Sequence, residues 1–338
     1  MNATQRGMSL TAWAPVGLLR RPFAADKGLP EVSDIPDLGA VPERVAVPAE
    51  LVGRLVTAQF PQWATLPVTP VPDGGWDNWT FHLGSEMSAR MPSATEYSLA
   101  VEKEQRWLPV LAPRLPLPIP TPVAKGEPGE GYPFPWSIYA WLDGEPASAD
   151  RVADPVRFAV DLAEFLGALR RVDPAGGPRP GLHNWYRGGT LRTYAAIVQE
   201  AVIKLASHVD VDVITGIWQD ALDAPWDGTE MWFHGDVAPS NLLLVDGELA
   251  AVIDFGTCGV GDPACDLAIA WTLLTADGRQ AFLETLAVDD AAWRRGRGWA
   301  LWKTLATCIH TLDRVDDKAL AAREVLDGIV AEYTSERT

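Results

Sequence analysis

The chain has 338 residues, of which 47% are hydrophobic and 22% charged, a composition typical of globular proteins with a buried core. Its formal net charge of −17 argues against nucleic acid as a partner, because binding to phosphates requires clustered positive charge. No apolar run is long enough to span a membrane, and residues 8–19 make a poor signal peptide because their arginine pair follows them. Three scattered cysteines predict a reduced, cytoplasmic setting.

The acidity is unevenly distributed along the chain. Residues 1–145 carry 16 acidic and 11 basic side chains, whereas residues 146–338 carry 29 acidic and 17 basic ones. An acidic cleft raises the local concentration of cations, so a cationic small molecule is one candidate partner. The alternative is that the negative charge only confers solubility.

The N-terminal third is expected to be rich in strands. Residues 1–45 combine proline, glycine and charge without periodicity, which predicts a tail or surface strap. A short helix is expected over residues 50–60, followed by strands within residues 68–92. Gly74 and Gly75, which precede the strand that carries Arg90, either allow close backbone approach to a phosphate or simply form a turn.

A helix is predicted over residues 93–111, opened by a capping box of Ser93 and Glu96. Glu104 falls on its apolar face, where a buried acid requires a partner. Proline-rich residues 109–135 predict an extended connection to a strand at 136–142. The remainder is expected to be mostly helical, with helices at 154–169, 190–207, 263–275, 278–286, 291–312 and 317–334.

A hairpin is predicted around Asp246-Gly247, a strong two-residue turn signal between two apolar runs. Counting back from the turn pairs Leu242 with Ala251 and places Asn241 across from Val252, next to Asp254. Carboxamide and carboxylate oxygens are the hard ligands that Mg²⁺ prefers when it is shared with phosphates. Asp236, five residues before Asn241, could accept a proton from an attacking hydroxyl.

These motifs resemble a known family. His234-x-Asp236-x4-Asn241, followed by Ile253-Asp254-Phe255-Gly256, resembles the catalytic loop and metal-binding segment of the kinase-like fold. The His-Gly-Asp form and the run from Gly261 to Ala268 are similar to the aminoglycoside phosphotransferase family. The resemblance covers the chain from about Leu51 onward. It implies a bilobal α+β protein-kinase-like fold, with a nucleotide-binding N-lobe at 46–142 and a catalytic, acceptor-binding C-lobe at 143–338.

The resemblance also implies the reaction and the residues that perform it. It implies transfer of the γ-phosphoryl group of ATP or GTP, with Mg²⁺, to a hydroxyl of a small molecule. Asp236 is expected to be the catalytic acid or base, with His234 supporting the loop, and Asn241 and Asp254 to hold the metal. Asp266 is expected to brace the loop. A second acid, Asp262, either caps the helix that follows it or acts directly.

The nucleotide contacts implied by the resemblance include one departure. Arg90 stands where relatives usually have the lysine that bridges the phosphates and a helix glutamate, here Glu104 with Glu102 as the second choice. The backbone of residues 139–142, including Tyr139 and Trp141, is expected to meet the nucleotide base. Gly74 and Gly75 would cover the phosphates.

The acceptor stays open at this level. Candidates are an aminoglycoside, a macrolide, or a metabolic alcohol such as an amino-sugar, choline-like or homoserine-like compound. Trp271 and Trp302 are candidate walls of its pocket, although most of the 15 tryptophans must lie in the core. Because Arg90 replaces lysine, a nucleotide-binding protein without transfer activity is a further alternative. The chain is expected to be a monomer or homodimer, without nucleic-acid or membrane partners.

Overall fold

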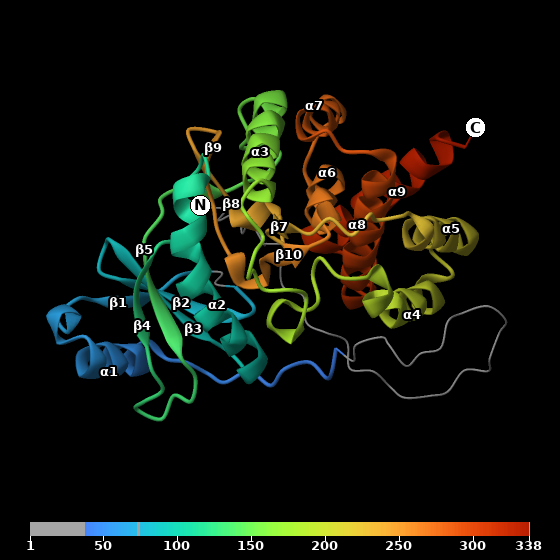
Figure 1. The fold of residues 1–338 in the computed structure, drawn as a ribbon. Coiled ribbons are helices and arrows are strands. Elements are labelled where there is room, and N and C mark those ends of the chain that lie inside the picture. Colours follow the sequence, from blue (N-terminus) through green and yellow to red (C-terminus); the bar gives the residue numbers. More distant parts are fainter. Residues whose placement is uncertain (1–37, 73–74, 338) are drawn as a thin grey trace, which may run out of the picture.

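The computed structural model describes residues 38–72 and 75–337, so Gly74 and most of the predicted tail lie outside the described residues. The first part of the chain forms an antiparallel sheet in the order β1-β2-β3-β5-β4. Its strands are β1 (Val68–Pro70), β2 (Asn78–Leu83), β3 (Met87–Pro92), β4 (Pro122–Gly126) and β5 (Trp136–Ala140). Helix α1 (Ala49–Gln59) packs against this sheet at one end of the molecule (Figure 1).

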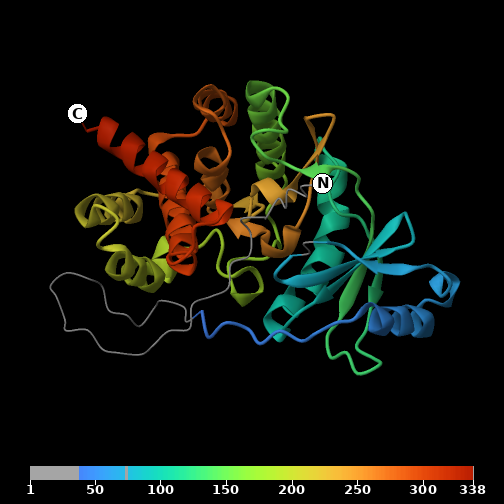
Figure 2. The same ribbon diagram turned by 180° about the vertical axis from the view of Figure 1, so that it is seen from behind.

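Helix α2 (Thr95–Leu111) lies between the sheet and the helical remainder (Figures 1 and 2). The predicted capping box is wrong. Ala94 occupies the cap position, and the Ser93 hydroxyl instead donates to the Trp76 carbonyl at 3.1 Å. Glu104 lies on the buried face of the helix, as its spacing predicts.

The rest of the chain is mostly helical. The predicted helix at 190–207 is a short 3₁₀ turn followed by α4 (Ala195–Leu205), and an unpredicted helix, α5 (Val211–Asp223), follows it. The other helices are α3 (Pro155–Arg170), α6 (Ile269–Thr272), α7 (Ala276–Leu286), α8 (Asp290–His310) and α9 (Asp317–Ser335). Helix α8 crosses the middle of this part and buries Trp299 and Trp302 in its core. The architecture is the mixed α+β one that the sequence predicts, with a strand-rich first part and a helical remainder.

The predicted hairpin forms, but its register differs by one residue. Strands β8 (Leu242–Val245) and β9 (Glu248–Val252) pair across a turn at Asp246-Gly247, whose φ angles of 51° and 82° fit that sequence. Leu242 pairs with Val252 rather than Ala251, because the ladder shifts between Leu243 and Leu244. Asn241 consequently lies opposite Ile253, whose N–H donates to its carbonyl at 2.8 Å.

Two shorter pairings complete the described strands. β7 (Met231–Phe233), which leads into the catalytic loop, pairs with β10 (Gly259–Gly261), and β6 (Glu145–Pro146) extends the hairpin beside β8. All three cysteines are buried and free. Among the described residues, no helix combines the length and apolarity needed to cross a membrane.

Candidate active site

The loop after β7 is stabilised by two residues, Gly235 and Asp266. Gly235 has a φ of 85°, and a Cβ there would lie 2.6 Å from the Thr257 carbonyl, so the position requires glycine. The carboxylate of Asp266 accepts from the N–H groups of His234 and Gly235 at 2.9 and 2.7 Å. Burial raises the pKa of Asp266, and these two N–H groups oppose that rise by stabilising its charge. Asp266 thus lies where a brace for the loop is expected.

His234 links the loop to the segment that follows the hairpin. Its Nδ1 accepts from the Asp236 N–H at 3.2 Å, so Nε2 carries the proton that it donates to the Ile253 carbonyl at 3.0 Å. Its ring also packs edge-on against Phe255. Both ring nitrogens are engaged and the residue is fully buried, so His234 is placed where it holds the shape of the loop.

Asp236 is hydrogen-bonded to two side chains, one of which is positively charged. Lys303, from α8, donates to Oδ1 at 2.5 Å, and the Asn241 amide donates to Oδ2 at 3.3 Å. Burial raises the pKa of Asp236, but the positive charges of Lys303 and Arg187 outweigh burial and hold that pKa below its ordinary value. The carboxylate is therefore ionised at neutral pH and able to accept a proton.

Asn241 and Asp254 are brought together by the end of the hairpin. The backbone bond from Ile253 to Asn241 places the asparagine beside the residue that precedes Asp254. Asp254 has a left-handed φ of 67°, a conformation uncommon for residues other than glycine and often found at functional positions. Since the Asn241 NH₂ group binds Asp236, its Oδ1 and the Asp254 carboxylate are the oxygens suited to Mg²⁺.

Arg90 bridges the sheet, α2 and the Asp254 segment. Its guanidinium lies 2.7 Å from Asp254 Oδ1 and 3.7 Å from Glu104 Oε1. The second oxygen of Glu104 accepts from the buried Tyr139 hydroxyl at 2.8 Å. Glu102, the alternative to Glu104, instead pairs with Lys125 and has a side chain 68% exposed. The structure thus places Glu104, not Glu102, beside Arg90.

The other predicted nucleotide contacts are less defined. Gly75 is exposed at the start of the segment leading into β2. The Trp141 N–H donates to the Glu86 carbonyl at 2.8 Å, and its ring lies against His82. That N–H is already engaged within the sheet, so a nucleotide contact at Trp141 would use its carbonyl or its half-buried ring.

Three further residues belong to the site, although the sequence analysis assigned them no role there. The Lys103 amine donates to the carbonyls of Gly256 and Cys258 at 2.6 and 3.0 Å, joining α2 to the Asp254 segment. Burial and the charges of Asp254 and Asp236 raise the pKa of Asp77 to about 8.

Arg187 supports the catalytic loop from the C-lobe side. Its Nε donates to the Gly235 carbonyl at 3.1 Å, and its guanidinium lies 4.4 Å from the centre of the Trp302 ring. The composition of its segment, Asn-Trp-Tyr-Arg-Gly-Gly, is distinctive in the sequence, but no chemical rule ties it to a loop 48 residues away.

Asp262 stabilises the turn that follows it. It caps the 3₁₀ turn at Pro263–Ala268 by accepting from the Ala264 N–H at 3.1 Å, and it pairs with Arg295 at 2.7 Å. Its two carboxylate oxygens are thereby used within the fold, which matches the helix-cap alternative.

The two tryptophans offered as pocket walls lie in the helical core. The Trp271 ring stacks on Trp293 with centroids 4.0 Å apart, and its N–H donates to Glu332. The Trp302 ring is 1% exposed and packs on Tyr194. Neither ring is among the residues that line the pocket beside Lys303.

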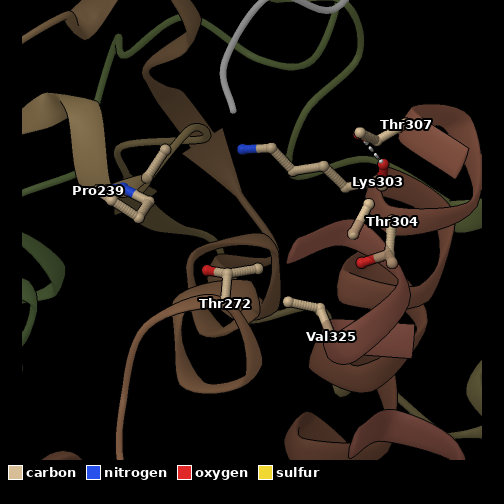
Figure 3. A pocket seen from close by; sticks show the side chains of 8 residues that line it. Pro239, Thr272, Lys303, Thr304, Thr307 and Val325 are labelled. Carbon is tan, nitrogen blue, oxygen red and sulfur yellow. Dashed lines mark hydrogen bonds between the residues drawn. The ribbon is translucent and has the colours of Figure 1, made fainter. Parts of the chain in front are cut away.

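A small, partly open pocket with a cavity volume of about 30 Å³ lies beside Lys303 (Figure 3). The side chain of Lys303 extends across it from α8 toward the catalytic loop. The lining comes from the catalytic loop, α6, α8 and α9, through Ala238, Pro239, Thr272, Lys303, Thr304, Thr307, Ala322 and Val325.

The fold and this constellation define a kinase-like phosphotransferase. The model of the phosphotransferase enzyme family (APH) matches residues 68–299, so the chain belongs to that family and is a kinase-type enzyme. No curated protein sequence matches the chain significantly.

Solved structures with the same fold include antibiotic phosphotransferases. The GDP and kanamycin complex of APH(2")-IIia is 22% identical, with a TM-score of 0.66 over 83% of this chain and 98% of that one. The ADP-bound APH(2'')-Ib is 16% identical, with a TM-score of 0.55 over 85% and 99%. The macrolide 2'-phosphotransferase MphH from Brachybacterium faecium is 20% identical, with a TM-score of 0.53 over 82% and 98%. At these identities the likeness shows the fold.

Proposed function

We propose that the protein transfers the γ-phosphoryl group of ATP or GTP, with Mg²⁺, to a hydroxyl of a small molecule. The observation that carries this proposal is the double attachment of Asn241. Its amide donates to Asp236, and its backbone pairs with Ile253 next to Asp254. The candidate proton acceptor and the candidate metal ligands therefore form one rigid unit.

The residues present divide the chemical work. Mg²⁺, held by Asn241 Oδ1 and the Asp254 carboxylate, would supply charge neutralisation on the phosphates. Asp236 orients the acceptor hydroxyl and takes its proton as the hydroxyl oxygen bonds to the γ-phosphorus. The bond from that phosphorus to the β–γ bridging oxygen breaks, and the nucleoside diphosphate leaves. Arg90 adds positive charge on the phosphate side, where it lies beside Asp254.

The donor and acceptor are supported only as classes. Structures of similar fold hold GDP in one case and ADP in another, which keeps both purine nucleotides as candidates. Similar structures include complexes or enzymes for kanamycin and macrolides, which favours an antibiotic-type acceptor. A metabolic alcohol is the alternative. We also propose the lobe boundaries at 46–142 and 143–338, a monomeric or homodimeric state, and a cytoplasmic location.

The test is a transfer assay with ATP and GTP against one panel of aminoglycosides and macrolides and one of metabolic alcohols. Mass spectrometry should detect an acceptor that has gained a phosphoryl group, and Asp236→Ala should abolish that product while largely sparing nucleotide binding. Activity on no antibiotic would end the antibiotic interpretation. Unchanged turnover in Asp236→Ala would overturn the assigned base.

A further inference from the structure

The acceptor side of the site carries a positive charge. Lys303 lies 67 positions after Asp236 in the sequence, yet its amine donates to the candidate base at 2.5 Å. The same side chain lines the pocket that opens beside the loop (Figure 3). An acceptor in this pocket that brings its hydroxyl to Asp236 therefore meets the Lys303 ammonium at close range.

No acid opposes this charge on the described pocket wall. Apart from Lys303, the lining within residues 38–72 and 75–337 consists of alanine, proline, valine and threonine. The Thr307 hydroxyl is already bonded to the Lys303 carbonyl at 3.0 Å. A polycation entering the pocket would find a like charge and no carboxylate except Asp236 itself, which Lys303 already neutralises.

Two acidic side chains of the C-terminal half are paired with arginines within the fold. Glu332, on α9, pairs with Arg279 at 2.8 Å and also accepts from two tryptophan N–H groups. Asp220 lies within 3.4 Å of both Arg294 and Arg297. Both carboxylates thus have cationic partners, and neither belongs to the pocket lining.

We propose that the acceptor has no positive charge beside its reacting hydroxyl and presents an oxygen, from a hydroxyl, carbonyl or carboxylate, to Lys303. This inference rests on the proposed phosphotransfer. Among the candidate acceptors it favours the uncharged or anionic metabolic alcohols over the polycationic aminoglycosides. Before the acceptor arrives, Lys303 neutralises Asp236. An acceptor oxygen then takes over a hydrogen bond from the Lys303 amine, which leaves the Asp236 carboxylate to receive the hydroxyl proton. Lys303 is thus a positioning and specificity residue.

The inference is tested by comparing acceptor classes in the wild type, in two variants at position 303 and in one control variant. Wild type, Lys303→Met and Lys303→Arg are assayed with a polycationic aminoglycoside, a neutral polyol and a hydroxycarboxylic acid. Lys204→Met is the matched control, because Lys204 is an exposed lysine on α4 that pairs with Glu200. Transfer is measured as kcat and KM, and binding by calorimetry with Mg²⁺ and a non-hydrolysable nucleotide.

In wild type, kcat/KM for the neutral or anionic acceptor should exceed that for the polycation by at least tenfold. Lys303→Met should reduce this ratio about tenfold, mainly through KM. Lys303→Arg, which keeps the positive charge, should retain the wild-type ratio, and Lys204→Met should leave it unchanged. A structural role alone would lower all classes equally. An unchanged ratio in Lys303→Met would overturn the inference.

Binding separates this inference from the proposed function. Tightest binding of the polycation, or binding of none of the three classes, overturns the inference whether or not phosphate is transferred. Preferential binding of the uncharged or anionic class without transfer of phosphate supports the inference and contradicts the phosphotransfer proposal.

Discussion

The nucleotide side and the acceptor side of this site are built in different ways. On the nucleotide side, Arg90 and Glu104 come from neighbouring elements, and Arg90 reaches Asp254 at 2.7 Å. On the acceptor side, Lys303 comes from a helix near the end of the chain and neutralises Asp236. The His-Gly-Asp motif marks Asp236 itself, whereas only the packing of α8 brings Lys303 to it. Under the proposed function, the residues for the reaction and the residue for acceptor choice come from separate parts of the chain.

The largest effect on the nucleotide side is expected from Arg90→Met. The change leaves Glu104 buried without its cation, so the free energy of unfolding should fall by about 3 kcal/mol. Loss of the charge near the phosphates should lower kcat/KM for the nucleotide about 100-fold. Denaturant unfolding and nucleotide kinetics measure both. Arg90→Lys should retain most of the stability, and Arg106→Met, on the exposed face of α2, should change neither. Wild-type nucleotide kinetics in Arg90→Met would contradict a role for Arg90 at the phosphates.

Lys103→Met tests how the nucleotide side is anchored. The buried amine satisfies the Gly256 and Cys258 carbonyls, and the substitution leaves both without this donor. The free energy of unfolding should therefore fall by roughly 2–4 kcal/mol. Lys125→Met, which removes only surface pairs, should change it by less than about 1 kcal/mol. Equal effects of the two changes in denaturant unfolding would refute the anchoring role.

Asp77→Asn is expected to stabilise the protein. The folded state raises the pKa of Asp77 to about 8, mainly through burial and the nearby Asp254 and Asp236. A raised pKa penalises the ionised form, so the penalty is absent below the ordinary pKa and complete above about pH 8. The variant should gain roughly 1–3 kcal/mol of unfolding free energy at pH 8 and almost nothing near pH 4. A gain independent of pH, or one shared by the exposed Asp327→Asn, would contradict this explanation.

The smallest expected effect lies on the acceptor side. Lys303 helps to hold the pKa of Asp236 below its ordinary value, despite the burial that raises it. The stability and activity that depend on ionised Asp236 are fully present above the ordinary pKa of a carboxyl group. They are lost as pH falls through the lowered pKa of Asp236 in the folded protein. Lys303→Met should therefore move the acidic limb of the kcat/KM profile to higher pH. An unmoved limb would show that Lys303 does not act on the base.

The sequence predicts most of the nucleotide side because local rules govern it. The helical period places Glu104 on the inner face of α2, and the Asp246-Gly247 turn sets the hairpin that carries Asn241. The predicted pairing of Leu242 is wrong because the strand register shifts between Leu243 and Leu244, and no glycine or turn residue in the sequence indicates that shift. Likewise, the capping box fails because Ser93 finds a tertiary partner in Trp76.

The acceptor side could not be predicted in the same way. Lys303 is one of several basic residues on an expected helix, and no periodicity links it to a loop 67 positions earlier. Overall charge is a poor guide because residues such as Asp220 and Glu332 are neutralised by arginines within the fold. Both facts depend on how helices pack, which a single sequence does not specify.

The central claim is that Asp254 serves nucleotide and metal binding while Asp236 serves the transfer step. The most direct measurement is nucleotide affinity with and without Mg²⁺, together with turnover, in Asp254→Asn and Asp236→Asn. Asp254→Asn should lose the affinity that depends on Mg²⁺, and turnover with it. Asp236→Asn should keep that affinity within a few-fold and lose turnover by at least about 1,000-fold. Mg²⁺-dependent binding that survives in Asp254→Asn, or turnover that survives in Asp236→Asn, would contradict the account.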